Sequence, residues 1–500
     1  MSMPLSRVNV RLLALALAGA VSPAWAAWPK LDPSLLDARQ DGAKARPVEA
    51  MIELKGRADA LLLDRRGDVA ERRGAWMKML RAHAERSQAD LLDALKAEGA
   101  EFRSYWINNT VWVRATPDVL ARISRRADVD FVYANAPLSE NLPQPEIDAG
   151  PASKAVLAVE WGVNKIRAPQ VWAAGFRGAG VVVAGQDTGV RWDHAALKAK
   201  YRGWNGTSAN HNYHWHDAVH SGGIASCPAN SAVPCDDHNH GTHTVGTIVG
   251  AAGANQIGVA PDAKWIACRN MNSGAGTPAT YTECMQWFLA PTNLAGGSPD
   301  PSKAPDIINN SWGCPSSEGC TPKSILQSAV NALVDGGIFF VVSAGNDGSS
   351  CASLVDPPAI YEKSFTIGST TSGDAMSSFS SRGPVSGAAF NKPDAVAPGS
   401  NVRSALRNGS YGTMSGTSMA GPHVAGAAAL LISAYPALRG QPEQIADLLR
   451  ASAVHISSTQ TCGGIPSTRF PNPVQGDGRI DVYAAYQQAA LLFAKDAAGE

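Results

Sequence analysis

The chain has 500 residues, of which 45% are hydrophobic and 17% are charged. This composition is typical of a globular protein and excludes a disordered or fibrous chain. The length exceeds what one small core needs and predicts two or three units. Lysine plus arginine equals aspartate plus glutamate at 43 each, so no basic surface is implied and we expect no nucleic-acid partner.

The first residues have the pattern of a secretory signal. Arg7 and Arg11 precede an apolar run at 12–21, and the small-x-small sequence Ala-Trp-Ala follows at 24–26. The run is shorter than the about 20 residues that a membrane-spanning helix needs, which makes an uncleaved anchor the less favoured alternative. We expect residues 1–26 to be removed and the protein to be secreted, to the medium or the periplasm, with no membrane attachment afterwards.

Between residues 47 and 138 the predicted elements follow the order β-α-β-β-α-β, which is the ferredoxin-like split unit. The expected strands lie at 50–54, 102–107, 110–115 and 129–133, with one or two helices at 69–98 and a short helix at 117–126. Thr116, followed by Pro117, is a typical start of that short helix. The proline-rich segment that follows, about 137–155, is interpreted as an exposed linker of the kind that proteases cut.

From residue 178 on, short apolar runs alternate with helical stretches. The runs lie at 181–184, 265–267, 307–308, 338–342 and 365–367. Near-continuous apolar strands separated by helices indicate an α/β fold with a mostly parallel sheet covered on both faces. In this architecture functional residues collect at the carboxyl ends of the strands and on the loops that follow.

Eight cysteines lie beyond residue 220. An even number in an exported chain indicates disulfides, and the metal-site alternative is disfavoured because no Cys-x-x-Cys pair is present. Eight cysteines allow many pairings. Neighbours along the sequence suggest Cys227–Cys235, Cys268–Cys284 and Cys314–Cys320, leaving Cys351–Cys462.

Two candidate catalytic residues lie at the ends of predicted elements. Asp187 lies three residues after the run at 181–184, at the carboxyl end of the predicted strand, where a carboxylate could orient an imidazole. A plain turn aspartate before Thr-Gly is an equal alternative. His240, in His-Gly-Thr-His, opens a predicted helix. The H-x-x-H spacing is half of a zinc site, but the glutamate that usually follows the first histidine of zinc helices is missing. We therefore expect no catalytic metal.

Ser418 begins a long helix of small residues, within Gly-Thr-Ser-Met-Ala-Gly-Pro-His-Val-Ala-Gly at 416–426. The ordinary interpretation is a helix N-cap. The same place suits a nucleophile, because unpaired N–H groups and the positive end of the helix dipole stabilise an oxyanion. Asn346 follows the apolar run at 338–342 and, taken alone, is an ordinary turn asparagine.

The order Asp, His, Ser is that of the subtilisin arrangement. Asp-Thr-Gly at 187–189, His-Gly-Thr-His at 240–243 and the segment at 416–426 resemble the three active-site signatures of the subtilisin-like serine peptidases. The resemblance extends over about 161–485 and implies the subtilisin-like three-layer α/β fold. Stretches at 187–197, 258–267 and 309–313 are similar to the bacillopeptidase F-like branch of this family.

The resemblance implies a role for each residue. Ser418 is the nucleophile, His240 the general base and then acid, and Asp187 the carboxylate that orients it. Asn346 and the backbone N–H of Ser418 form the oxyanion hole. The implied function is a secreted monomeric endopeptidase that cleaves protein or peptide substrates through an acyl-enzyme. No cofactor is expected for catalysis, and calcium stabilises relatives, but no spacing here defines a calcium site.

Two segments resemble the edges between which the family holds an extended substrate by strand addition. They are Ser311, Trp312 and Gly313 on one side and Ser273, Gly274, Ala275 and Gly276 on the other. Plain turn chemistry is the alternative for the second segment. Asp356, near the pocket for the residue before the cut, would favour arginine or lysine there, but a structural aspartate before two prolines is the preferred interpretation.

Residues 47–138 resemble the family's propeptide in position and element order. The expected organisation is a signal at 1–26, a propeptide with linker at 27–150 that inhibits its own enzyme, and a peptidase domain at 151–500. The slow folding of a parallel sheet gives a physical reason for such a folding helper. A catalytically silent binding protein on the same fold is the alternative, although such proteins usually lack one of the groups that this chain keeps. A sedolisin-like acid peptidase would need other residues in place of His-Gly-Thr-His.

Overall fold

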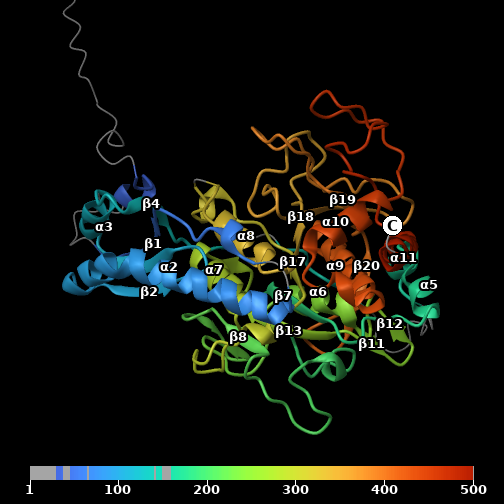
Figure 1. Ribbon diagram of the computed structural model, residues 1–500, viewed down its shortest axis with the longest axis horizontal. Helices are drawn as coiled ribbons and strands as arrows, with labels where there is room; N and C mark the ends of the chain where they lie inside the picture. Colours follow the sequence, from blue (N-terminus) through green and yellow to red (C-terminus); the bar gives the residue numbers. More distant parts are fainter. Residues whose placement is uncertain are drawn as a thin grey trace, which may run out of the picture.

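The computed structural model describes residues 30–37, 46–64, 67–139, 142–148, 159–321 and 323–498. The predicted signal at residues 1–26 lies outside the described residues. The described chain forms two regions, an N-terminal α+β region at 46–135 and a larger α/β region at 159–498, which lie side by side in Figure 1. Among the helices described, none combines the length and the apolar character needed to cross a membrane.

The N-terminal region is a four-stranded antiparallel sheet with two helices. Its elements are β1 (Val48–Leu54), α2 (Val69–Ala97), β2 (Glu101–Tyr105), β3 (Thr110–Ala115), α3 (Pro117–Ser124) and β4 (Val129–Ala134), preceded by the short helix α1 (Ser34–Asp37). The strand order is β2-β3-β1-β4, so the predicted split unit is confirmed. Segment 69–98 is a single helix whose N-cap, Asp68, accepts hydrogen bonds from the backbone N–H groups of Ala70 and Glu71.

The strands of this region bury both of their faces. Along β1, Ala50 and Ile52 lie in a core shared with Leu91 of α2. The intervening Met51 points to the opposite face and joins a second core with Trp112 of β3. That second core continues into helices α7 (Pro278–Leu289) and α8 (Gln327–Asp335) of the larger region.

The larger region is built on a seven-stranded sheet in which every neighbouring pair is parallel. In spatial order the strands are β19 (Ala395–Pro398), β18 (Phe365–Thr370), β17 (Phe339–Ser343), β16 (Ile307–Asn310), β7 (Val182–Asp187), β13 (Lys264–Arg269) and β8 (Trp215–Asp217). Five of these strands are predicted by the apolar runs, whereas β8 and β19 are not. The parallel α/β sheet expected from the sequence is confirmed.

Helices cover both faces of this sheet, which gives the three layers seen in Figure 1. One face carries α4 (Trp161–Lys165), α5 (Ala168–Ala173), α6 (His240–Val249), α9 (Thr417–Ala434), α10 (Pro442–Ala451) and α11 (Val482–Ala498). The other face carries α7 and α8. Neighbouring residues of β17 separate accordingly, because Val341 lies in the first core and Val342 in the second.

Short elements and disulfides complete the region. The short strands are β9 (Gly223–Ile224), β10 (Cys227–Pro228), β11 (Ala251–Ala252), β12 (Asn255–Gln256), β14 (Met271–Asn272), β15 (Ala275–Gly276), β20 (Val402–Ala405) and β21 (Tyr411–Met414). The 3-10 turns of this region are η3 (Lys198–Lys200), η4 (Pro301–Lys303), η5 (Ser316–Glu318) and η6 (Pro436–Leu438), while η2 (Ala60–Leu62) lies in the N-terminal region. The four disulfides are Cys227–Cys235, Cys268–Cys284, Cys314–Cys320 and Cys351–Cys462, the pairing suggested by the sequence.

The segment between the two regions adds strands to two of these small sheets. Its strand β5 (Leu138–Ser139) pairs antiparallel with β15, and its strand β6 (Glu146–Ile147) pairs antiparallel with β21. Leu142, between them, is only 5% exposed. The part of the predicted linker that the structure describes is therefore tied to the larger region at both ends.

Candidate active site

Asp187 and His240 are hydrogen-bonded inside the α/β region. Asp187 is the last residue of β7 and His240 the first of α6. The Nδ1 atom of His240 lies 2.8 Å from Oδ1 and 2.9 Å from Oδ2 of Asp187, and both side chains are almost fully buried. A carboxylate in this position fixes the imidazole tautomer with Nε2 free to accept a proton.

Neighbouring polar groups hold this pair in place. The backbone N–H of Thr188 donates to Asp187 Oδ1 at 2.7 Å, and the Thr188 hydroxyl links the backbone N–H of Gly241 to the carboxylate of Asp236. A Cβ atom at Gly241 would collide with the carbonyl oxygen of Gly189. The glycine in His-Gly-Thr-His therefore lets the start of α6 approach the end of β7 closely enough for the hydrogen bond.

Ser418 lies in the first turn of α9, whose N-cap is Gly416. The interpretation of Ser418 as the cap itself is thus off by two positions, and no side-chain cap bond is present. Its Oγ donates to the carbonyl oxygen of Ser311 at 3.0 Å. The Nε2 atom of His240 is buried and has no hydrogen-bond partner among the described residues. In this conformation the serine hydroxyl is therefore directed away from the imidazole.

Asn346 follows β17 and reaches the start of α9. Its Oδ1 accepts hydrogen bonds from the backbone N–H and the hydroxyl of Thr417, at 2.9 and 3.0 Å. These bonds fix the amide so that its Nδ2 atom faces away from Thr417. A Cβ placed on Gly416 would lie 3.5 Å from Asn346 Nδ2 and 3.6 Å from the backbone N of Ser418. The amide nitrogen of Asn346 and the backbone nitrogen of Ser418 thus lie near one point.

One predicted substrate edge, residues 273–276, is a turn followed by a short paired strand. Ala275 and Gly276 form β15, which already pairs with β5 of the same chain, while Ser273 and Gly274 have positive φ angles of 51° and 89° and form the turn before it. The turn interpretation therefore holds for Ser273 and Gly274. Because β15 lies between β14 and β5, an extended peptide could pair with it only in place of β5.

The other edge, Ser311 to Gly313, follows β16. Trp312 is buried, stacks on Tyr281 with ring centroids 3.7 Å apart, and donates its indole N–H to the carbonyl oxygen of Gln186 at 3.0 Å. The Trp312 side chain is thus part of the core under the edge.

Sequence reasoning missed three residues of the inter-region segment that lie in the cleft. Leu142 and Pro143 line a cavity of about 380 Å³ together with Asn346 and Ser418. The Nε2 atom of Gln144 lies 2.8 Å from Nε2 of His238, two residues before His240. The segment therefore crosses from the loop of Ser418 to the loop of His240. Its proline-rich composition signalled a linker and carried no signal for this contact.

His243 and His423 are buried histidines of the two signature helices. The Nε2 of His243 lies 3.0 Å from the carbonyl oxygen of Val402, and the Nδ1 of His423 lies 2.9 Å from that of Met419. Burial lowers the pKa of His243 to about 3 and that of His423 to about 4. Both are neutral packing residues.

The described residues contain no group of three or more histidine, cysteine, aspartate or glutamate side chains placed to hold a metal ion. His240 and His243, the two histidines of the H-x-x-H sequence, point to different partners, Asp187 and the carbonyl of Val402. They do not converge on a common point as zinc ligands would.

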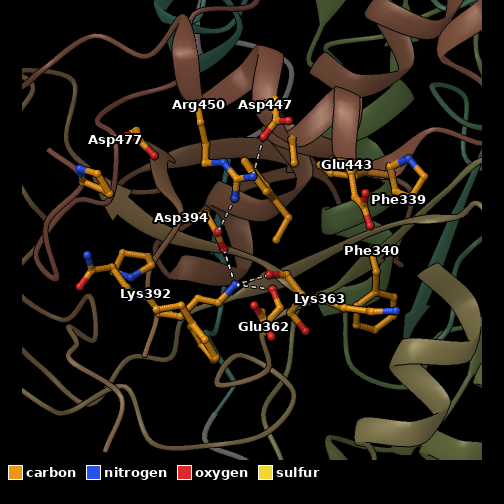
Figure 2. A pocket seen from close by; sticks show the side chains of 18 of the residues that line it. Phe339, Phe340, Glu362, Lys363, Lys392, Asp394, Glu443, Asp447, Arg450 and Asp477 are labelled. Atoms are coloured by element: carbon orange, nitrogen blue, oxygen red, sulfur yellow. Dashed lines mark hydrogen bonds and ion pairs between the residues drawn. The ribbon is translucent and has the colours of Figure 1, made fainter. Parts of the chain in front are cut away.

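A larger cavity of about 870 Å³ lies elsewhere, beside α10. Figure 2 shows its chain of ion pairs, in which the Lys392 ammonium donates to Asp394 Oδ2 at 2.6 Å and Arg450 donates to Asp394 Oδ1 at 3.1 Å. Arg450 also bonds Asp447 at 2.8 Å. None of the predicted site residues lines this cavity. We interpret the network as a structural link between α10 and the segment before β19.

Comparisons with known proteins agree with this geometry. A model of the Subtilase family matches residues 178–479. Bacillopeptidase F of Bacillus subtilis (strain 168) is 37% identical over 432 residues, which cover 83% of this chain but only 28% of that protein. Subtilisin of Bacillus pumilus is 32% identical over 307 residues, 60% of this chain and 94% of that protein. Subtilisin E of Bacillus subtilis (strain 168) is also 32% identical over 307 residues, 60% of this chain and 68% of that protein. The chain therefore belongs to the subtilase family of serine peptidases, in its bacillopeptidase F-like branch.

Proposed function

We propose that this chain is a secreted serine endopeptidase, made as an inhibited precursor, in which Asp187, His240 and Ser418 form the catalytic triad. The observation that carries the proposal is the buried hydrogen bond between Asp187 and His240, with Ser418 in the first turn of α9. Membership of a peptidase family supports peptide bonds as the substrate. We propose no cofactor for catalysis.

Acylation follows from the positions of these groups. The Ser418 side chain turns from the carbonyl of Ser311 to Nε2 of His240, which accepts its proton as Oγ bonds to the substrate carbonyl carbon. The imidazolium is stabilised by Asp187. The oxyanion is held by the backbone N–H of Ser418 and by Nδ2 of Asn346. His240 then gives the proton to the leaving amine as the carbon–nitrogen bond breaks.

Deacylation runs through the same groups with water as the nucleophile. His240 takes a proton from the water as its oxygen bonds to the acyl carbon, and the second oxyanion occupies the same site. The bond from the carbon to Ser418 Oγ then breaks, and His240 returns the proton to Oγ. The products are a free carboxylic acid and the original enzyme.

The inter-region segment supports the proposal of an inhibited precursor. Its backbone at β5 extends β15, and its Leu142 and Pro143 line the cavity that also contains Ser418. A substrate needs the same edge and the same cavity. We therefore propose residues 1–26 as the signal, 27–150 as an inhibitory propeptide and 151–500 as the peptidase domain.

The test is hydrolysis of casein by the peptidase domain, produced with the N-terminal region as a separate chain so that maturation needs no self-cleavage. Ser418→Ala is expected to lose activity by a factor on the order of 10⁶, as loss of the serine does in subtilisin. Ser433→Ala, on the same helix, is the matched control, because its hydroxyl bonds the carbonyl of Leu430 away from the cleft. It should keep near wild-type activity.

Hydrolysis at the wild-type rate by Ser418→Ala would refute the proposed nucleophile. A wild-type protein that stays inactive once the N-terminal region has been removed would favour the binding-protein alternative instead.

A further inference from the structure

The cavity beside Ser418 is acidic. Among the described residues that line it, the charged ones are Asp347 and Asp356, and none is lysine, arginine or histidine. The remaining lining is apolar or uncharged and includes Trp312, Ala344 and Ala359. When a substrate carbonyl lies at Ser418 with its oxygen at Asn346, the side chain on its acyl side enters this cavity. The cavity thus meets the residue before the cut.

Asp347 lies at the rim of the cavity, next to the proposed oxyanion hole. It is exposed, and it directly follows Asn346. Its backbone N–H donates to the Ser381 hydroxyl at 3.0 Å, and that hydroxyl donates to Asp347 Oδ2 at 3.2 Å. One carboxylate oxygen is thus fixed by a neutral partner, and within the described part of the chain no ion pair compensates the negative charge.

Asp356 is the more buried of the two carboxylates, with 27% of its side chain exposed. Its recorded ion-pair partner is Lys323, whose Nζ lies 4.0 Å away and whose own side chain is 42% exposed. An exposed pair at that distance compensates little charge. Burial raises the pKa of Asp356, the Lys323 ammonium opposes this, and the charge of Asp347 adds to it. A further cation in the cavity would lie near two carboxylates that lack a close partner.

Leu142 of the inter-region segment, which lies in the cavity, contacts only its apolar part. Leu142 is 5% exposed and belongs to the same apolar core as Ala344 and Trp312. Leucine offers no positive charge to Asp347 or Asp356. A side chain with an aliphatic stem and a cationic head would contact the apolar walls and the carboxylates together.

We propose that Asp356, assisted by Asp347, makes this enzyme prefer lysine or arginine immediately before the cleaved bond. The inference rests on the proposed function, since it describes the substrate of the same site. It also revises the sequence-based interpretation of Asp356 as a structural residue. The substrate class is therefore a peptide chain with an exposed basic residue in an extended segment.

The experiment measures kcat/KM of the mature enzyme on one peptide sequence that carries lysine, norleucine, arginine, leucine or phenylalanine before the cut. Norleucine has the stem of lysine without the charge, so the lysine-to-norleucine ratio isolates the electrostatic contribution. We expect a ratio of at least about 10, the effect of one partly screened charge pair. Asp356→Asn should lower the ratio several-fold while leaving norleucine and leucine substrates nearly unchanged.

Two further variants show whether a change in the lysine-to-norleucine ratio comes from the charge of Asp356 or from a defect in folding. Lys323→Met removes the competing ammonium and should raise the lysine-to-norleucine ratio. Asp262→Asn is the matched control, a carboxylate 43% exposed whose ion pair with Arg177 lies outside the cleft, and it should leave the ratio unchanged. Equal rates for lysine and norleucine in the wild type, or a ratio unaffected by Asp356→Asn, would overturn this inference alone. Failure to cleave any of the peptides would overturn the proposed function itself.

Discussion

The two regions of the molecule differ in how their sheets are covered. The seven-stranded sheet has its own helices on both faces, with Val341 turned towards α6 and α9 and Val342 towards α7 and α8. The N-terminal sheet packs one face on α3 and on the C-terminal half of α2. Its other face, which carries Met51 and Trp112, packs into the same core as α7 and α8. The N-terminal region is thus completed by the larger region.

Polar contacts also attach the N-terminal region to the larger region. Arg73 of α2 is buried and donates to the carbonyl oxygens of Gly336, Gly337 and Ala304 at 3.0, 3.3 and 3.5 Å. Burial lowers its pKa to about 10, so it remains charged at neutral pH. The N-terminal region therefore needs contact with the larger region to cover one face of its sheet, whereas the larger sheet is covered by its own helices. This is the asymmetry that a removable inhibitor needs.

The largest expected effect on docking comes from Trp76→Ala in α2. Trp76 is 2% exposed and donates its indole N–H to the carbonyl oxygen of Ala332 in α8 at 2.9 Å. Truncating a buried tryptophan costs about 3–5 kcal/mol, which corresponds to a roughly 10²–10³-fold weaker complex. The measurement is the inhibition constant of the N-terminal region added to the mature peptidase as a separate chain.

Leu61→Ala provides the control for this prediction, because Leu61 is 91% exposed. This variant should leave the inhibition constant unchanged. If Trp76→Ala inhibits as tightly as the wild type, the two regions do not meet as described, and the asymmetry between them fails.

A smaller effect is expected from pH, through a cluster that spans the two regions. Glu283 of α7 lies 2.9 Å from Nε2 of both His216 and His220, and it also accepts from Tyr105 at 3.1 Å and Arg103 at 3.4 Å in the N-terminal region. Burial lowers the pKa of His220, but the hydrogen bond and charge of Glu283 raise it above its ordinary value overall, and Arg103 opposes that rise.

Docking therefore brings a positive charge towards His220 and makes its protonation less favourable. By linkage, protonation of His220 weakens docking, so affinity is greatest above the pKa of His220 in the free enzyme and falls as the pH falls through it. We expect the inhibition constant to rise several-fold between about pH 8 and about pH 5.5. Glu53, whose pKa burial raises to about 7, also titrates near this interface, so the readout is a comparison of variants.

Glu283→Gln should flatten this pH dependence, because its neutral amide no longer raises the pKa of His220. Glu443→Gln is the control, since Glu443 lines the cavity of Figure 2 away from the interface. Identical pH profiles for the wild type and Glu283→Gln would exclude the cluster as the cause.

The sequence predicts most of the fold because apolar runs and turn chemistry are local signals. It misses β8, Trp-His-Asp at 215–217, and β19, Ala-Val-Ala-Pro at 395–398. The first has no apolar run and the second is short and ends in proline. These edge strands exist because neighbours pair with them, β13 with β8 and β18 with β19. Such pairing is a tertiary effect that periodicity does not report.

The residues of the candidate site also fall into those with a local sequence signal and those that depend on tertiary contacts. Asp187, His240, Ser418 and Asn346 are predicted because together, in this order, their local sequences resemble the signatures of one family, although each taken singly has an ordinary structural interpretation. Leu142 and Asp347 are not predicted as parts of the cavity, because their place there depends on segments far apart in the chain meeting at one cleft. The sequence places Asp356 near this pocket but favours a structural role for it. The structure brings Asp187 and His240 into contact, while the Ser418 hydroxyl contacts the carbonyl of Ser311.

Covalent labelling tests most directly whether Ser418 is the activated nucleophile. Mature protein would be treated with a serine-directed fluorophosphonate, digested and mapped by mass spectrometry. We predict a single modified site at Ser418, with labelling greatly slowed in His240→Ala, since the hydroxyl then lacks its base. Labelling at another serine, or full peptidase activity in protein whose Ser418 has been modified, would contradict the account.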